Sequence, residues 1–286
     1  MSEGLRLGDD GDERAACEAF LRRIGGGPDR PLPIAEAALA LAALDRPRVP
    51  LARYLHHLTL LARDAADLAR RAAGLDGRVA TLNDVILGKY GYQGDTLTYD
   101  DLQNANLMRV IDRRKGLPVA LGILYIHTAR AQGWDVAGLA FPGHFLVRLD
   151  HDGERAILDP FNAGAVLDAA ALRDLLKATA GQEAELDPHY YAPVSDRDVL
   201  LRLQNNVKLR RMQMQRPEEA LAAIETMLLF APDHAALWRE AGLVNAHLDN
   251  LGAAIDRLER FMALETGDAL RHKTALLLQQ LKGRLN

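Results

Sequence analysis

The sequence is poor in cysteine and in aromatic residues. Among 286 residues it holds one cysteine, Cys17, and Trp, Tyr and Phe together make up 5%. A single cysteine excludes a disulfide framework within the chain and a cysteine-rich zinc site. Residues 1–12 lack the basic start and the apolar run of a signal peptide. These two features predict a protein of the reducing cytoplasm.

Long apolar runs and an excess of one charge are also missing. No stretch approaches the roughly 20 apolar residues that cross a bilayer. The 35 basic residues nearly balance the 39 acidic ones, which gives a net charge of -4, and no basic stripe with interleaved aromatics is present. We therefore expect no membrane and no nucleic acid among the partners.

Several catalytic motifs are absent as well. The chain contains no G-x-G-x-x-G, P-loop, H-E-x-x-H or G-x-S-x-G element. Nucleotide-dependent chemistry, zinc proteolysis and serine hydrolysis therefore lose their usual sequence support. We expect neither a cofactor nor a metal.

What is present is an ordinary globular composition, with 49% hydrophobic and 26% charged residues, and a length typical of two domains. Helical spacing of apolar residues predicts helices over 13–23, 34–44, 51–73, 79–87 and 118–131. The last of these is apolar nearly all round, so it should be buried. Strands are predicted over 136–141, 144–149 and 155–158, joined by turns at 142–143 and 150–153. Helices packed before and against a small antiparallel sheet make an α+β domain.

An internal repeat follows this domain. Pairs of similar residues recur 34 positions apart: Gln204 and Trp238, Leu209 and Leu243, Ala220 and Ala254, Leu221 and Ile255, Ile224 and Leu258, Met227 and Phe261. A period of 34 is that of tetratricopeptide helix pairs. The sequence thus predicts a leader over 1–12, an α+β domain over 13–190 and helical repeats over 196–286, with a capping helix over 271–285.

Chemistry-bearing side chains concentrate at two points of the predicted sheet. His144 is expected to open one strand and Asp159 to close the next, so the two side chains can meet across a hairpin. An imidazole whose Nδ1–H faces a carboxylate is the base and its orienting group in a catalytic triad. Such a pair needs a nucleophile, and the helix N-terminus at Pro118 is where a cysteine would be activated.

From Leu82 to about Gly164 the chain resembles the SirB1 family, whose core is similar to the transglutaminase-like, papain-related fold. The resemblance rests on the segments 82–83, 90–95, 113–118, 142–145 and 159–161. It implies C-terminal tetratricopeptide repeats and a regulatory or accessory role. In transglutaminase-like enzymes a Gly-x-Cys element opens the core helix, and Gly116-Leu117-Pro118 is similar to it.

The chain departs from that pattern at the nucleophile. Pro118 stands where the cysteine would, and no Cys, Ser or Thr occurs between Leu117 and His127. Covalent acyl transfer requires a nucleophilic side chain. Three roles for His144 and Asp159 therefore stay open: a hydrogen bond that locks the hairpin, a contact with a partner or ligand, and activation of water by His144.

Two functions follow. The first is a non-catalytic regulatory or adaptor protein that binds a protein partner through its repeats, because such repeats form concave surfaces. We expect Trp238, Asn245, Asn205 and Arg148 to contact that partner. The alternative is a hydrolase or acyl transferase that uses the His–Asp pair without the usual cysteine. The basic cluster 113–115 is either solvated or paired with Asp100, Asp101 or an acidic partner.

Overall fold

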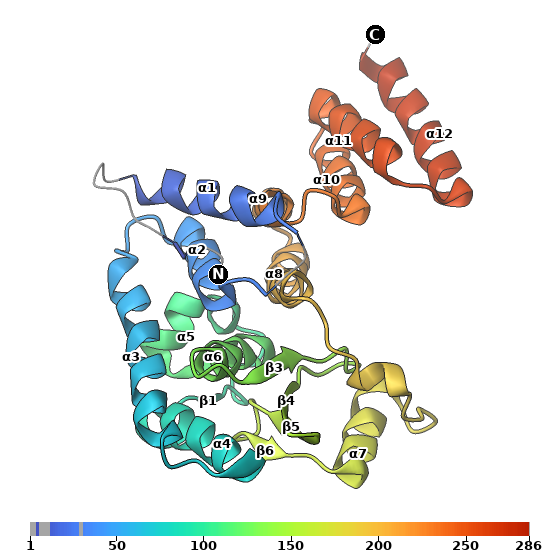
Figure 1. The fold of residues 1–286 in the computed structure, drawn as a ribbon. Helices are drawn as coiled ribbons and strands as arrows, with labels where there is room; N and C mark the ends of the chain where they lie inside the picture. Colours follow the sequence, from blue (N-terminus) through green and yellow to red (C-terminus); the bar gives the residue numbers. More distant parts are fainter. Residues whose placement is uncertain (1–3, 6–11, 29–30, 286) are drawn as a thin grey trace. The chain divides into compact units, whose positions relative to one another are not determined.

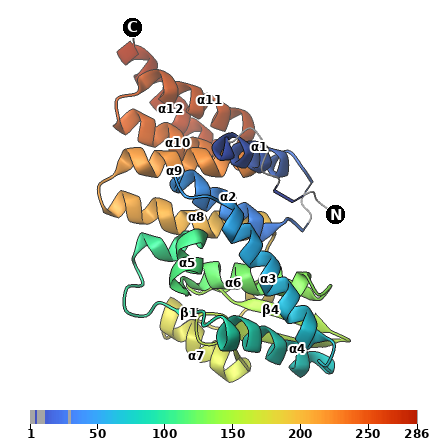
Figure 2. The same ribbon diagram turned by 90° about the vertical axis from the view of Figure 1, so that its left-hand side faces the viewer.

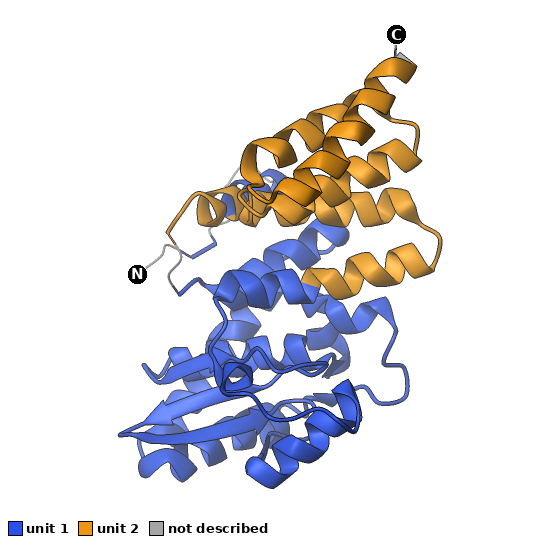
Figure 3. Cartoon of the chain, turned by 90° about the vertical axis from the view of Figure 1, so that its right-hand side faces the viewer, with its two compact units in different colours: residues 1–20, 29–203 blue, residues 21–28, 204–286 orange. Residues whose placement is uncertain are grey.

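The computed structural model describes residues 4–5, 12–28 and 31–285 (Figure 1). Most of the predicted leader over 1–12 lies outside the described residues. The chain divides into two compact units, 1–20 with 29–203 and 21–28 with 204–286 (Figure 3). The predicted boundary near residues 190–196 stays a prediction. No helix in the described ranges is long and apolar enough to span a membrane.

Unit 1 combines helices with two small sheets. Its helical elements are α1 (Glu13–Gly25, shared with unit 2), α2 (Ile34–Asp45), α3 (Ala52–Ala69), α4 (Gly74–Asn83), the π-helix η1 (Asp84–Lys89), the 3-10 helix η2 (Leu102–Ala105), α5 (Leu107–Arg113), α6 (Pro118–Arg130), α7 (Ala169–Ala180), the 3-10 helix η3 (Pro188–Tyr191) and α8 (Asp196–Gln213, shared with unit 2). Its strands are β1 (Gln93–Gly94), β2 (Lys115–Gly116), β3 (Asp135–Gly138), β4 (Val147–His151), β5 (Glu154–Asp159) and β6 (Ala165–Val166). The α+β class is confirmed.

Helix α6 forms the centre of unit 1. Every residue from Pro118 to Ile126 is buried, as its all-round apolar sequence predicts. The proline occupies the first turn, where a missing N–H costs nothing. Helices α2, α3 and α5 pack around α6 on one side (Figures 1 and 2), and β3 and β4 pack on the other. At Gly122 an added Cβ would overlap the Phe145 ring, so the absence of a side chain lets the helix approach the sheet.

The main sheet is antiparallel, in the order β3-β4-β5-β6. Two predicted strand boundaries are wrong: β3 ends at Gly138 rather than 141, and β4 begins at Val147 rather than 144. The reason lies in distant partners, because beyond Gly138 the chain pairs with residues 192–194: Leu139 bridges Pro193, and the Ala140 N–H donates to the Ala192 carbonyl. His144 therefore lies in a turn and not in a strand.

The predicted helix over 79–87 is wrong in its bounds. The structure has α4 over 74–83, followed by the π-helix η1. The short parallel pair β1–β2 and the strand β6 carry no periodic signal, since each has two residues.

Unit 2 contains α9 (Pro217–Phe230), α10 (Ala235–His247), α11 (Leu251–Leu264), α12 (Asp268–Leu285) and residues 204–213 of α8. Three of the residue pairs spaced by 34 occupy equivalent core positions, since Ala220 and Ala254, Ile224 and Leu258, and Met227 and Phe261 are all buried, whereas Leu209 is exposed. Gly242 lets α10 approach α11, because a Cβ there would meet the side chain of Leu258. Helix α12 packs on α11 through Leu278 and Leu281, as the predicted capping helix should.

Candidate functional site

His144 and Asp159 meet in the structure. The His144 Nε2 atom lies 2.9 Å from Asp159 Oδ1, and the two side chains are 11% and 2% exposed. Asp159 is the last residue of β5, whereas His144 belongs to the turn before β4. The nitrogen that faces the carboxylate is Nε2, not the Nδ1 that the triad pattern suggested. The Nδ1 atom is therefore the one on the far side of the ring from Asp159.

The Asp159 carboxylate is surrounded by donors. Its Oδ1 accepts the backbone N–H groups of Phe161 (3.0 Å) and Asn162 (3.2 Å), and its Oδ2 accepts from Asn162 Nδ2 (2.7 Å). Burial acts to raise the pKa of this carboxyl, but the hydrogen bonds from His144 and Asn162 outweigh it and hold the pKa below its usual value. Asp159 is therefore ionised at neutral pH and orients the imidazole.

A second layer of hydrogen bonds fixes the loop 160–164. Asn83 donates through Nδ2 to the Gly164 carbonyl (3.1 Å), and its Oδ1 accepts from the Tyr125 hydroxyl (2.8 Å). Burial, together with the nearby Asp159 charge, raises the pKa of Tyr125, so its hydroxyl stays a donor. This links α6 to the loop that carries Asn162. These contacts give Asn83 a structural role.

Arg202 holds the other side of the pair. Its guanidinium donates to the carbonyl of His144 (2.6 Å) and to that of Phe141 (3.3 Å), and it lies over the Phe145 ring. Sequence reasoning missed this residue because it lies 58 positions after His144, in a segment that reads as an ordinary polar helix face. Only the pairing of residues 192–194 with β3 brings the start of α8 to the turn.

Aromatic rings cover His144. The Phe161 ring packs edge-on against His144 (6.1 Å between centroids) and against Tyr99 (5.7 Å).

Tyr99 belongs to the loop 95–101, whose geometry depends on Asp95. The carboxylate of Asp95 pairs with Arg113 (2.8 Å), so Asp95, which the sequence did not indicate, is an acidic partner of this basic cluster. The pairing of β1 with β2 brings Asp95, which follows β1, close to Arg113, which precedes β2. The sequence did not reveal this pairing.

Pro118, which the family resemblance aligns with a nucleophilic cysteine, is buried in the first turn of α6. Cys17 does not replace it. This thiol lies in α1, is fully buried, and has its pKa raised to about 11 by burial and by Glu13 and Glu18. A protonated, inaccessible thiol does not attack a carbonyl. Within the described ranges no group of three or more His, Cys, Asp or Glu side chains is placed to hold a metal ion.

A second polar cluster explains the 90–92 segment and Arg114. His57 Nε2 lies 2.7 Å from the Tyr92 hydroxyl and 2.9 Å from Arg114 Nη1, and the guanidinium lies over the Tyr90 and Tyr92 rings. Burial lowers the pKa of His57 to about 4, with a further contribution from the Arg114 charge. A neutral imidazole is the acceptor that Arg114 needs. The cluster anchors the chain between η1 and β2.

The four residues expected to contact a partner fall in different environments. Arg148 lies on β4 and is paired with Asp150. Trp238 donates through its indole N–H to the Pro232 carbonyl, and Asn245 is buried with its amide bonded to the Ala241 carbonyl. Asn205 is half-buried on α8. The expectation that these residues contact a partner stays a prediction.

A buried helix packed on an antiparallel sheet that carries an oriented His–Asp pair, followed by paired helices of period 34, defines a transglutaminase-like protein with helical repeats. Residues 52–205 match the family model of the transglutaminase-like superfamily, and residues 207–279 match that of the tetratricopeptide repeat. The chain belongs to the SirB1 family of this superfamily.

Named relatives agree with this assignment. A UPF0162 protein of Xylella fastidiosa (strain Temecula1) is 33% identical over 190 residues, which cover 65% of this chain and 68% of the relative. A UPF0162 protein of Vibrio cholerae is 29% identical over 80% of this chain and 85% of its own length. The protein SirB1 of Salmonella typhimurium is 26% identical over 65% of this chain and 70% of its own length.

Proposed function

We propose that this protein is a non-catalytic member of its superfamily that binds a protein partner through the first helix of its repeats. The proposal is supported by Pro118, a buried proline in the first turn of α6, which stands where the family resemblance leads us to expect the nucleophile that covalent chemistry needs. His144 and Asp159 then serve to lock the turn before β4 onto the end of β5. The repeats supply the binding surface.

One face of α8 supports this surface. Leu209 and Met212 are 56% and 44% exposed, and Asn205 lies four positions before Leu209. Residues three and four apart share one face of a helix. Two exposed large apolar side chains on one face favour a partner that contributes an apolar stripe, such as an amphipathic helix.

We expect the double change Leu209→Gln with Met212→Gln to lower the affinity for such a partner at least tenfold, since exposed apolar anchors carry most of the energy of an interface. Both side chains face solvent, so the melting temperature should stay unchanged. The measurement is recovery of one stoichiometric partner on the immobilised full chain, followed by titration calorimetry with that partner. Leu276→Gln on α12 is the matched control, because Leu276 is 50% exposed. Equal retention by the double variant would refute this surface.

The oriented His144–Asp159 pair favours one alternative, hydrolysis by a water that His144 activates. The two functions differ in what His144→Ala does. For a locking pair, the change lowers the free energy of unfolding by about 1–3 kcal/mol, because the buried Asp159 loses a hydrogen bond, and no turnover exists to be lost. His151→Ala is the control, since this imidazole pairs with the exposed Asp152 and not with a buried carboxylate. If the wild type turns over an ester or amide substrate, and His144→Ala abolishes this turnover without changing the stability, the protein is a hydrolase instead.

A further inference from the structure

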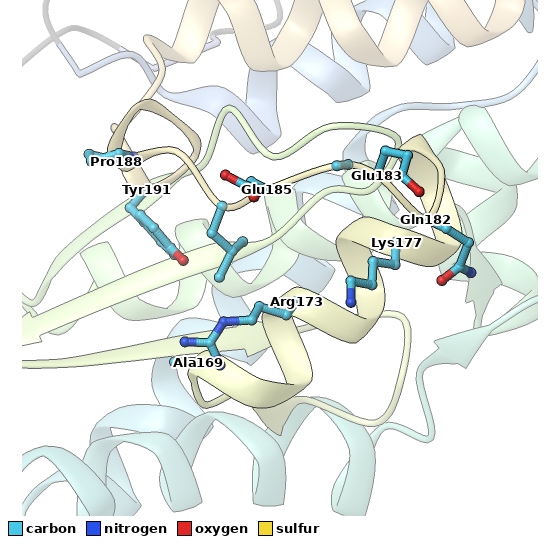
Figure 4. A pocket seen from close by; sticks show the side chains of 10 residues that line it. Ala169, Arg173, Lys177, Gln182, Glu183, Glu185, Pro188 and Tyr191 are labelled. Carbon is cyan, nitrogen blue, oxygen red and sulfur yellow. The ribbon is translucent and has the colours of Figure 1, made fainter.

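A pocket of about 660 Å³ lies in unit 1 beside α7, and neither His144 nor Asp159 lines it. It is bounded by α7 and by the segment 182–191 that follows the helix (Figure 4). Its volume is within the range of small-molecule sites. Its lining residues are Ala169, Arg173, Lys177, Gln182, Glu183, Ala184, Glu185, Leu186, Pro188 and Tyr191.

The walls of this pocket are fixed by the fold. Helix α7 is capped by Gly181, whose φ of +104° favours glycine and lets the chain turn back. The returning segment is anchored by Leu186, Tyr190 and Tyr191, which pack on an apolar cluster containing Leu172 and Leu176 of α7. The carbonyl of Tyr191 also accepts from Arg148 Nη1 on β4 (3.2 Å). These contacts hold the returning segment against the helix.

The charges that line the pocket are separated by sign. Arg173 and Lys177 are one turn apart on α7, whereas Glu183 and Glu185 come from the returning segment (Figure 4). Over residues 31–285 the structure shows no ion pair for any of these four side chains. The two cations are neighbours on one helix face and repel each other, and the two carboxylates belong to the segment that bounds the other side of the pocket. Neither the two cations nor the two carboxylates therefore have a counter-charge among the described residues.

We propose that this pocket binds a small zwitterion, a free short peptide, whose carboxylate pairs with Arg173 and Lys177 and whose ammonium pairs with Glu183 and Glu185. The four wall charges sum to zero, so a purely anionic ligand meets the two carboxylates and a polyamine meets the two cations. A ligand with one group of each sign satisfies both walls at once. Leu186 and the Tyr191 ring supply apolar surface for the side chain between the two ends.

The test uses the full chain and a leucine-centred tripeptide as the probe in titration calorimetry. The peptide with two free ends should bind, and either an N-acetyl or a C-terminal amide group should weaken binding about tenfold, since each removes a charge-assisted contact. Binding that is equal for the free and the doubly blocked peptide, or no binding at millimolar concentration, would overturn the proposal.

Variants then assign the ends. Arg173→Gln should weaken the free and the N-acetylated peptides about tenfold and leave the amidated peptide unchanged. Glu185→Gln should do the converse, by weakening the free and amidated peptides alone. Arg173, Glu185 and the control residue Asp174 are all exposed, so these changes preserve folding. The control is Asp174→Asn, on α7 but outside the pocket; an equal loss in this variant, or a loss independent of which end is blocked, would refute the site.

Discussion

Asp95→Ala is expected to lower the free energy of unfolding of unit 1 by about 3 kcal/mol. The Asp95 carboxylate is 2% exposed and accepts from the Thr98 N–H (3.0 Å), the Thr98 hydroxyl (2.7 Å) and Arg113 Nη2 (2.8 Å). Its removal leaves a guanidinium that is only 26% exposed without its charge partner. The loop that places Tyr99 against Phe161 also loses its anchor, so the cover of His144 loosens with it.

The measurement is chemical denaturation followed by Trp134, which lies in unit 1, in a Trp238→Phe background that removes the one other tryptophan. Asp84→Ala, at an exposed carboxylate of η1, is the control. Adding Arg113→Met to Asp95→Ala should cost less than the sum of the two changes, because the variants share one interaction. Strict additivity would show that the pair contributes nothing.

The effect of Asp95→Ala should also depend on pH. Burial acts to raise the pKa of Asp95, but hydrogen bonds from Thr98 and Arg113 outweigh burial and lower the pKa below its ordinary value. A carboxyl whose folded pKa is lowered stabilises the protein fully above the unfolded value of about 3.9. That contribution disappears as the pH falls through the folded pKa. The difference between wild type and variant should therefore be largest at neutral pH and shrink in strong acid.

Gly164→Ala is expected to cost about 4 kcal/mol. Gly164 has a φ of +62° and follows Ala163 at +55°, and the Ala165 N–H closes this turn onto the Asn162 carbonyl. A Cβ on Gly164 would overlap Asn83 Oδ1 and the Tyr125 hydroxyl, both of which belong to the hydrogen-bonded layer behind Asp159. Strain in the left-handed region and steric overlap therefore act together.

Gly153→Ala separates these two contributions. Gly153 has a φ of +85°, and nothing lies within 4 Å of an added Cβ. It should cost only the backbone strain, roughly 1–2 kcal/mol. Adding Asn83→Ala to Gly164→Ala should recover part of the loss, because the smaller side chain makes room. Equal melting temperatures for the two glycine variants would contradict the overlap.

Local patterns predicted much of the fold. The apolar run after Pro118 predicted a buried helix, and the 34-residue spacing predicted paired helices in which equivalent residues such as Met227 and Phe261 are buried. The boundaries of β3 and β4 were not predictable, because residues 192–194, some 50 positions away, compete for the edge of β3. The π-helix after α4 was missed for a different reason: a helical period does not distinguish it from an α-helix.

The candidate site shows the same division between sequence and structure. By itself the sequence determined the class of the fold and the meeting of His144 with Asp159, because residue types and short spacings carry these features. Only the tertiary structure decided that Nε2 faces Asp159, that Arg202 holds the His144 carbonyl, and that Asn83 and Tyr125 support the loop behind it. The separation of positive and negative side chains in the α7 pocket is likewise visible only in the tertiary structure. Such contacts join residues tens of positions apart, and their geometry follows from how buried elements pack, which no local pattern records.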